Sequence, residues 1–265
     1  MSRFTDQNYL KTSQYRDSSN LDARAALHQR FSTNPYGWQR WAFDHLLILP
    51  PTARILELGC GPAYLWKENA ERIPPGWVVT LSDLSAGMVD AAWRNLVVTG
   101  RNFKFEQIDA QSIPYPDGTF DAVIANHMLY HVPDRRKALS EIRRVLKDDG
   151  ILFAATLGKD HMREMWEHLE GVATITRETI TSAFTLENGT AQLQEFFSHV
   201  DMSRYEDNLR VTDLPAIMDY IRSMTSTSEF TEEQFQGIER EFTDAIKKNG
   251  EIFITKEAGL FLAQK

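Results

Sequence analysis

Two glycines spaced one residue apart, Gly59 and Gly61, are the first residues of this 265-residue chain that point to chemistry. They follow an apolar stretch at 55–58 that contains a single acid, Glu57, and they precede a helical pattern at 64–71. The segment therefore predicts a strand, a glycine turn and a helix. Glycine allows a positive φ and lets a ligand approach the backbone, and the N–H groups at a helix start can bind that ligand. A plain tight turn has the same glycines, so the interpretation depends on the residues downstream.

Polar residues stand at the ends of the next predicted strands, namely Asp83, Asp109 and Asn126. Ligands of open parallel sheets bind at the carboxyl ends of the strands, so we expect these side chains to share one edge. Asp83 lies about 20 residues beyond the first glycine, the spacing of an acid that binds a ribose diol. An acid after the third strand can accept from an exocyclic amine. Either aspartate alone could be a helix cap, but the complete set favours a nucleoside site.

The glycine loop differs from that of a nicotinamide dinucleotide site. The pattern G-x-G-x-x-G would place a third glycine at position 64, where this chain has Tyr64. Glu57, two residues before the first glycine, would repel a phosphate and attract a cation. The loop therefore predicts a nucleoside that carries a positive group, and it argues against an oxidoreductase that uses NAD.

The elements that must position these residues alternate regularly between 54 and 156. Apolar strand patterns occur at 54–58, 77–81, 103–108, 120–125 and 151–156, with helical patterns at 62–72, 85–96 and 134–146. This alternation predicts a doubly wound α/β fold with a mostly parallel sheet. We expect one domain made of an N-terminal helical arm or cap (1–50), a cofactor-binding core (51–157), a helical insertion or lid (158–200), and strands and helices that complete the sheet (201–265). Residues 200–211 predict one strand, and whether 250–262 form a hairpin or one bulged strand stays open.

Composition limits the class of protein. The net charge is −8 and no cluster of Lys or Arg stands out, which argues against nucleic acid as the main partner. Cys60 is the only cysteine, so no internal disulfide can form, and no Cys/His spacing predicts a metal site. The N-terminus is polar and no apolar run could span a bilayer, so we expect a cytoplasmic protein without membrane insertion. The oligomeric state is left open, with a homodimer as one option.

Residues 54–156 resemble a class I S-adenosylmethionine-dependent methyltransferase of the small-molecule type, similar to the ubiquinone/menaquinone-biosynthesis methyltransferases. The resemblance rests on residues 55–61, 79–88, 107–110, 120–132 and 146–156. It implies a Rossmann-like sheet of seven strands, S-adenosyl-L-methionine as the cofactor and S-adenosyl-L-homocysteine as the product. It fades before residue 50 and across 160–200, where the acceptor would be chosen. Ala63 stands where such loops often have another glycine, and its small side chain makes this a minor departure.

The resemblance also implies contacts to the cofactor. The residues concerned are Glu57, Gly59, Cys60 and Gly61 for the methionine half, Asp83 for the ribose, Leu84, Met88, Asp109 and Ala110 for the adenine, and Asn126 for the sulfonium. We expect Tyr15 to reach the cofactor from an N-terminal arm that folds over it, although a frayed terminus is the alternative. Arg30 is a candidate for the cofactor carboxylate, and an ordinary surface ion pair explains it equally well.

Catalytic and acceptor residues are harder to choose. His127 and His131 follow the fourth strand and could act as a base, because histidine titrates near neutral pH; the alternative is that they only pack and bond the loop. The candidate acceptor-binding residues are Tyr9, Trp38, His161, Met162 and Trp166. An aromatic stripe at helical spacing, such as the one that includes Trp38, is more often part of a core.

The sequence thus predicts methyl transfer to a small organic acceptor, with an aromatic or heterocyclic compound as one option, by in-line displacement. The atom methylated, O, N or C, is left open. The alternative from another class is a non-catalytic module that binds S-adenosylmethionine and acts through a partner.

Overall fold

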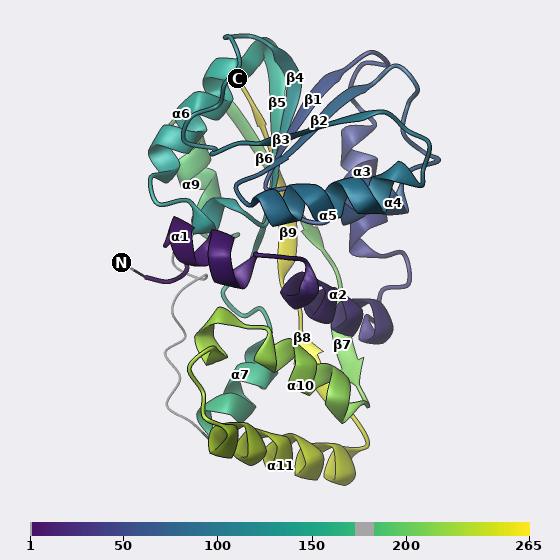
Figure 1. The fold of residues 1–265 in the computed structure, drawn as a ribbon, viewed down its shortest axis with the longest axis vertical. Helices are drawn as coiled ribbons and strands as arrows, with labels where there is room; N and C mark the ends of the chain where they lie inside the picture. Colours follow the sequence, from purple (N-terminus) through teal and green to yellow (C-terminus); the bar gives the residue numbers. More distant parts are fainter. Residues whose placement is uncertain (1, 173–182) are drawn as a thin grey trace.

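The structure, a computed structural model, describes residues 2–172 and 183–265. Its centre is a seven-stranded sheet with the order β3-β2-β1-β4-β5-β9-β6 (Figure 1). These strands are β1 (Arg54–Leu58), β2 (Val78–Asp83), β3 (Phe103–Gln107), β4 (Phe120–Asn126), β5 (Leu146–Leu157), β6 (His199–Tyr205) and β9 (Ala258–Gln264). β9 runs antiparallel to both of its neighbours, and the other neighbouring pairs are parallel. The predicted mostly parallel seven-stranded sheet is confirmed.

Helices cover both faces of the sheet. Successive side chains of a strand point to opposite faces, so each strand contributes to a core on either side. Ile55 of β1 packs in one core, and its neighbour Leu56 packs in the other. The first core lies under α3 (Trp38–Leu46), α4 (Tyr64–Glu68) and α5 (Ala86–Val97), and the second under α6 (Arg135–Val145) and α9 (Gly189–Gln194) (Figure 1). Near-continuous apolar strands, such as β1, are typical of a sheet that is buried on both sides.

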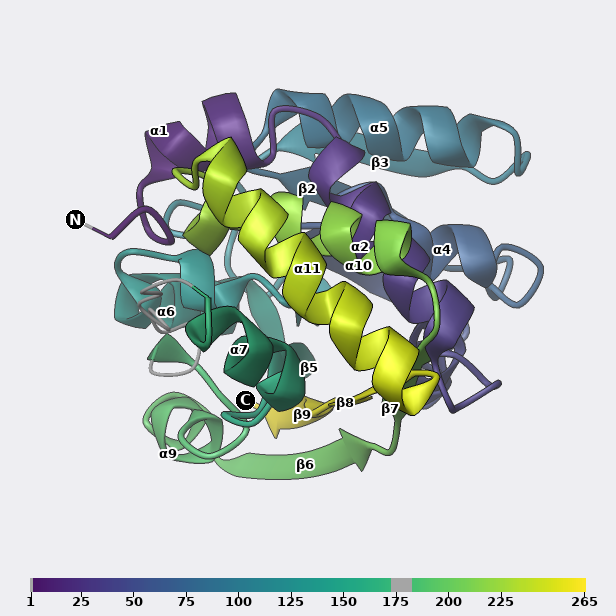
Figure 2. The ribbon, with the colours of Figure 1, turned by 90° about the horizontal axis from the view of Figure 1, so that it is seen from below.

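A second layer lies beyond the carboxyl ends of the parallel strands (Figures 1 and 2). It consists of α2 (Ser19–Phe31), α7 (Arg163–Glu170), α10 (Leu214–Arg222), the 3-10 turn Thr225–Thr227, α11 (Glu232–Asn249), and the antiparallel strands β7 (Asn208–Val211) and β8 (Ile252–Thr255). These elements share a core of their own, and α11 crosses over α10 in Figure 2. We call this second layer the floor, and it lies opposite the glycine turn.

Several expectations about the C-terminal third change in the structure. The predicted strand at 200–211 is two strands, β6 and β7, which belong to different sheets. Residues 250–262 form neither a hairpin nor one strand, because β8 pairs with β7 while β9 enters the central sheet. The expectation that 201–265 complete the sheet is therefore correct for β6 and β9 and wrong for β7 and β8. The predicted insertion contains α7 and α9, and its residues 173–182 lie outside the described part of the chain.

The N-terminal arm comprises α1 (Gln7–Tyr9), a π-helical turn (Leu10–Gln14) and the start of α2. Asp6 caps α1 by accepting from the N–H groups of Asn8 and Tyr9. The N-cap of α2 is Ser18, and the side chain of Asn20 donates to the carbonyl of Gln14. The arm lies between the two layers (Figure 1).

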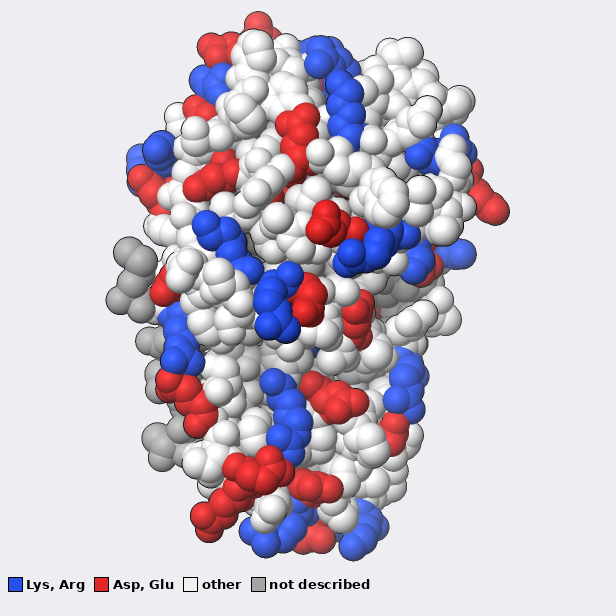
Figure 3. Space-filling view, viewed as in Figure 1, with Lys and Arg blue, Asp and Glu red and all other residues white. Residues whose placement is uncertain are grey.

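None of the described helices is long and apolar enough to cross a membrane. On the face drawn in Figure 3, Lys and Arg side chains are interspersed with Asp and Glu.

Candidate active site

The glycine turn after β1 has the unusual backbone that the sequence predicts. Gly59 has a φ of +69°, and a Cβ there would lie 2.8 Å from the Cβ of Met128. Gly61 also has a positive φ, +52°. Ala63 is left-handed as well, at φ 59°, so its departure from glycine places a side chain in a strained conformation. Helix α4 consequently begins at Tyr64, two residues later than predicted.

Two acids lie beside this turn, Glu57 buried and Asp83 partly buried. Glu57 is 3% exposed and accepts from the indole Nε1–H of Trp66 at 2.5 Å. Burial raises the pKa of Glu57 to about 7, with a further contribution from the nearby Asp83. Burial also raises the pKa of Asp83 to about 6, although the N–H groups of Ser85 and Gly61 donate to its carboxylate at 2.9 and 3.0 Å. A cation bound between the two carboxylates would offset their desolvation.

Asp109 lies after β3 and is bonded to the N-terminal arm. Its carboxylate accepts from Nε2 of Gln7 at 3.0 Å and from the backbone N–H of Gln111 at 2.9 Å. Burial alone would raise the pKa of Asp109, but these hydrogen bonds outweigh burial and hold the pKa below its ordinary value. An amine at this position would therefore meet an ionised acceptor.

A cavity of about 260 Å³ extends along the carboxyl edge of the sheet. Of the candidate residues named from the sequence, those that line it are Tyr15, Trp38, Glu57, Gly59, Cys60, Gly61, Asp83, Leu84, Met88, Asp109, Ala110, Asn126, His127 and His131. The structure thus brings together residues from four strand ends, the arm and α3. Within the described residues, no group of three or more His, Cys, Asp or Glu side chains could hold a metal ion.

His131 lies in the 3-10 turn Leu129–His131, in the loop after β4. Its ring forms hydrogen bonds with the N-terminal arm. Its Nδ1 lies 2.8 Å from the carbonyl oxygen of Phe4, so this nitrogen carries the proton and donates. Its Nε2, 2.9 Å from the hydroxyl of Tyr15, then accepts. Burial lowers the pKa of His131 to about 4, so the ring is neutral at pH 7. With both nitrogens engaged, the geometry favours a positioning role over that of a free base.

Asn126 ends β4 and His127 follows it, and both line the cavity. The Oδ1 atom of Asn126 is buried without a hydrogen-bond partner among the described residues. His127 has a φ of +53°, and its ring lies 5.0 Å from that of Trp38. Burial, with a smaller contribution from the charge of Lys256, lowers the pKa of His127 to about 4. A neutral imidazole and an unpaired amide oxygen therefore face the space next to the glycine turn.

Arg30 does not line the cavity. It is exposed and pairs with Asp213 at 2.5 Å, which is the surface ion pair that was the alternative. Arg24, two turns earlier in α2, lines the cavity instead, and its Nη2 is buried without a partner among the described residues. Arg24 and also His28, one turn further on, were not among the residues predicted from the sequence. The available signal was their four-residue spacing directly beside the apolar stripe of α2.

Four other acceptor candidates lie outside the cavity. Met162 and Trp166 pack in the core of the second layer, so they are structural. The ring of Tyr9 lies beneath the guanidinium of Arg3, at 5.3 Å. His161 is partly buried, and its Nδ1 accepts from the N–H of Glu257 at 3.2 Å. None of these four candidates for the acceptor site lines the cavity.

Comparison with known proteins agrees with this geometry. Residues 56–154 match the family model described as "Methyltransferase domain". The chain is thus similar to this family over a segment that spans β1 to β5 and contains the glycine turn, Asp83, Asp109 and Asn126.

Two curated relatives illustrate the similarity. A malonyl-[acyl-carrier protein] O-methyltransferase of Legionella pneumophila is 34% identical over 127 residues, which is 46% of this chain and 42% of that protein. The ubiquinone/menaquinone biosynthesis C-methyltransferase UbiE of Hahella chejuensis is 31% identical over 124 residues, 46% of this chain and 49% of that protein. The chain thus spans about half the length of these relatives. The second of these relatives is a ubiquinone/menaquinone-biosynthesis methyltransferase, the type that the sequence resembles.

Solved structures share the fold of the methyltransferase domain at low identity. The [4+2]-cyclase SpnF superposes with a TM-score of 0.60 and 19% identity, covering 98% of this chain and 97% of that one. A phosphoethanolamine N-methyltransferase of Haemonchus contortus, solved with S-adenosylhomocysteine, has a TM-score of 0.59 and 18% identity, covering 100% of this chain and 60% of that one. At such identity the likeness is one of fold.

The cofactor of this methyltransferase class is S-adenosylmethionine, and the residues of the cavity fit it. The sulfonium and the α-ammonium group are positive, and the acids Glu57 and Asp83 line the cavity. The apolar side chains of Leu84, Met88 and Ala110 line the same cavity beside Asp109, as an adenine ring requires. The unpaired Oδ1 of Asn126 lies at the end of β4, next to β1 and Glu57 in the sheet.

Proposed function

We propose that this chain transfers a methyl group from S-adenosylmethionine to a small organic acceptor by in-line displacement. The observation that carries the proposal is the pair of acids, the buried Glu57 and the partly buried Asp83, beside two positive-φ glycines at the end of β1. Withdrawing carboxylates from water is costly unless a cation compensates them. When bound, the cofactor supplies that positive charge and a methyl group on a good leaving sulfur.

The residues of the site would then act mainly by positioning. Asp83 would accept from the ribose hydroxyls, Glu57 would lie near the α-ammonium group, and Arg24 would pair with the carboxylate in place of Arg30. Alignment of two reactants can lower a barrier by about 7–11 kcal/mol, so no strong base is required. Asn126 Oδ1 could stabilise the electropositive methyl group through C–H···O contacts.

His131 and Tyr15 would hold the arm over the bound cofactor. The arm excludes water only while their hydrogen bond is formed, and a dry site strengthens every electrostatic contact within it. His127, whose side chain has no hydrogen bond to any described residue, is the group that could contact the acceptor. We therefore assign His131 to positioning and His127 to the acceptor side.

Thermal unfolding in the presence of ligands tests the proposal. A ligand at 100 times its dissociation constant stabilises a fold by about 2.7 kcal/mol. S-adenosylhomocysteine should raise the Tm of the wild-type chain, NAD should not, and Asp83→Ala should lose the rise. The matched control is Asp90→Ala, an exposed acid of α5, which should keep it.

Turnover is measured separately, by transfer of a labelled methyl group to small metabolites of a cell extract. A labelled product that depends on Asp83 supports the enzyme. Tight binding of S-adenosylhomocysteine with no labelled product in any extract would favour the non-catalytic module. The absence of any Tm rise would contradict both.

A further inference from the structure

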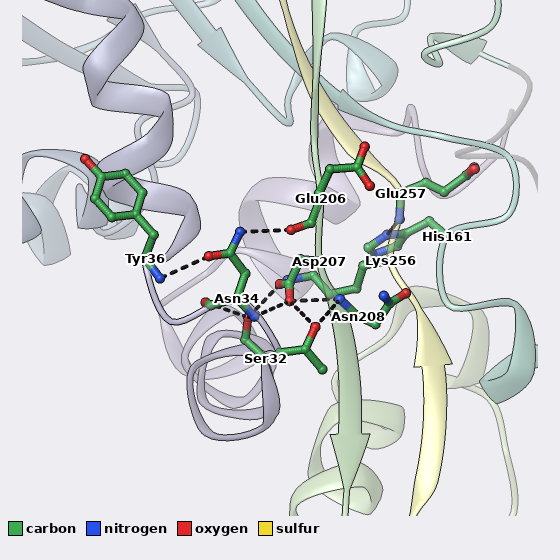
Figure 4. A network of polar contacts seen from close by, with 10 residues as sticks. Ser32, Asn34, Tyr36, His161, Glu206, Asp207, Asn208, Lys256 and Glu257 are labelled. Carbon is green, nitrogen blue, oxygen red and sulfur yellow. Dashed lines mark hydrogen bonds and ion pairs between the residues drawn. The ribbon is translucent and has the colours of Figure 1, made fainter.

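A buried ammonium group lies behind the acceptor side of the cavity. Lys256, between β8 and β9, has a side chain that is 8% exposed and pairs with Asp207, which is fully buried (Figure 4). A buried charge must be compensated, and here one carboxylate compensates it. Ammonium has three N–H donors, and within the described part of the chain the Lys256 side chain donates a hydrogen bond to Asp207 alone.

Asp207 has little capacity left for any other group. Besides Lys256, its carboxylate accepts from the hydroxyls of Ser32 and Thr33 and from the N–H groups of Asn34 and Asn208, at 2.6 to 3.2 Å (Figure 4). Glu257, the next acid along the chain, points away from Lys256 in Figure 4. The remaining donors of Lys256 are therefore not matched by a second carboxylate in this network.

An aromatic path connects Lys256 to the cavity. The ammonium lies 5.7 Å from the ring centre of Tyr205, and this ring lies 5.5 Å from that of Trp38. Trp38 in turn packs against His127, at 5.0 Å, and both line the cavity. Since Lys256 already occupies the neighbourhood of Tyr205, a second cation would be repelled there.

One imidazole, that of His127, lines this end of the cavity, and two more, His28 and His161, lie outside its lining. His28 and His161 have ring centres 6.1 Å apart, and Nδ1 of His28 is buried without a partner among the described residues. Burial, with a smaller contribution from the charge of Lys256, lowers the pKa of His127 to about 4 and that of His161 to about 3. The same causes hold the pKa of His28 well below its ordinary value. These rings can donate hydrogen bonds at neutral pH without adding negative charge.

The carboxylates of the cavity are Glu57, Asp83 and Asp109, all on the cofactor side, where the cations Lys11 and Arg24 also line it. Among the described residues, no carboxylate lines the acceptor side. That side has the neutral imidazole of His127, with the ion-paired Lys256 outside the cavity lining. We infer that the acceptor is an oxygen acid, a carboxyl, phenol or enol group that binds ionised, and not a protonated amine. This inference rests on the proposed function, because it names the acceptor of the same site.

The chemistry balances without a base in the transfer step. The acceptor loses its proton to solvent before it binds, and Lys256 favours the ionised form. A bond then forms between the ionised oxygen and the methyl carbon as the carbon–sulfur bond breaks. The electron pair of that bond stays on sulfur, so an anion and a cation become an ester or ether and a neutral thioether.

Ligand-observed NMR tests the inference on protein loaded with S-adenosylhomocysteine. The probes are two pairs of equal skeleton, benzoate with benzylamine and phenylacetate with phenethylamine. The acid of each pair should give the stronger saturation-transfer signal. Equal signals within the pairs, including none from either member, or stronger signals from the amines, would overturn the inference.

Lys256→Met should lower the affinity for benzoate at least tenfold and leave the affinity for S-adenosylhomocysteine unchanged. Because this variant leaves Asp207 without its cation, the double variant Lys256→Met with Asp207→Asn removes both charges and should show the same loss. Lys104→Met, an exposed lysine of β3, is the control. Undiminished benzoate binding in the folded double variant would mean that the lysine is only structural. Failure of the wild-type chain to bind S-adenosylhomocysteine would instead contradict the proposed function.

Discussion

At the scale of single residues, the site depends on acids held in surroundings that disfavour their charge. Glu57 is placed by β1 between Trp66 and Asp83, where burial raises its pKa to about 7. Only the ionised form attracts a cation strongly, so the fold bears a cost that ligand binding offsets. The role of Glu57 can therefore be tested through the free energy of unfolding and through the affinity for the cofactor.

Glu57→Gln should stabilise the ligand-free chain and weaken its cofactor binding. The pKa of Glu57 is raised on folding, so the folded state holds its proton longer than the unfolded state, whose pKa is about 4.5. The stability of the wild-type chain should therefore fall as pH rises from about 4.5 to about 7. In the variant this pH dependence should shrink, and the free energy of unfolding at pH 7.5 should rise by roughly 1–3 kcal/mol.

Urea unfolding at a series of pH values measures the first effect, and calorimetry with S-adenosylhomocysteine measures the second. For the wild type, binding at pH 6.5 should release a fraction of a proton, seen as a dependence of the heat on the buffer. A Glu57→Gln chain that binds as tightly as the wild type would contradict the role given to Glu57.

Residue types at the strand ends were predictable because a parallel sheet places those ends at one edge. Asp83, Asp109 and Asn126 therefore line one cavity. The partners of His131 were not predictable, since Phe4 and Tyr15 reach it through the path of the arm and not through sequence spacing. Arg30 failed as a candidate for a related reason, because the rotation of α2 directs Arg24 into the cavity.

At the scale of elements, the arm and the start of α5 meet closely. A Cβ at Gly87, in the first turn of α5, would lie 1.9 Å from the carbonyl oxygen of Arg16. The hydroxyl of Ser85, which caps α5, donates to the carbonyl of Tyr15 at 2.7 Å. The closed position of the arm over the cavity thus requires glycine at position 87.

Gly87→Ala should displace the arm while improving the helix propensity of α5 by up to about 1 kcal/mol. The displaced arm loses hydrogen bonds that contribute about 1 kcal/mol each, so we expect an affinity for S-adenosylhomocysteine about tenfold lower. Limited proteolysis should also cleave residues 2–20 sooner. Gly171→Ala is the control, because its φ is negative and its Cβ would have no atom closer than 3.4 Å. Unchanged affinity and unchanged cleavage in Gly87→Ala would show that the arm does not close the site.

Elements with strong periodicity were the ones that the sequence predicted well. The strand and helix alternation at 54–156 is confirmed. It was predictable because apolar residues predominate in most of these strands and helices alternate with them. The region 200–211 was predicted as one strand because Glu206 and Asp207 look like ordinary polar positions. Their role in separating β6 from β7 depends on Lys256 and Ser32, which are distant in sequence.

At the scale of the whole molecule, Asp207 lies where three connections between the two layers meet. These are the links from α2 to α3, from β6 to β7 and from β8 to β9, and they supply Ser32, Asp207 and Lys256 (Figure 4). Burial would raise the pKa of Asp207, but its bonds to Lys256 and Ser32 hold the pKa below the ordinary value. The carboxylate of Asp207 thus connects the central sheet with the second layer through its bonds to Ser32 and Lys256.

Asp207→Ala should therefore destabilise the chain by about 3–5 kcal/mol, because it leaves the Lys256 ammonium buried without its counter-charge. The loss should be unequal: hydrogen exchange should accelerate most in β7 and β8, while β1 and β4 keep their protection until global unfolding. Asp201→Ala, which removes an exposed acid of β6, should change stability by no more than about 0.5 kcal/mol. Adding Lys256→Met to Asp207→Ala should recover part of the lost stability, since no unpaired charge then remains. If exchange instead accelerates evenly over both layers, Asp207 contributes to the fold as a whole and does not join its two parts.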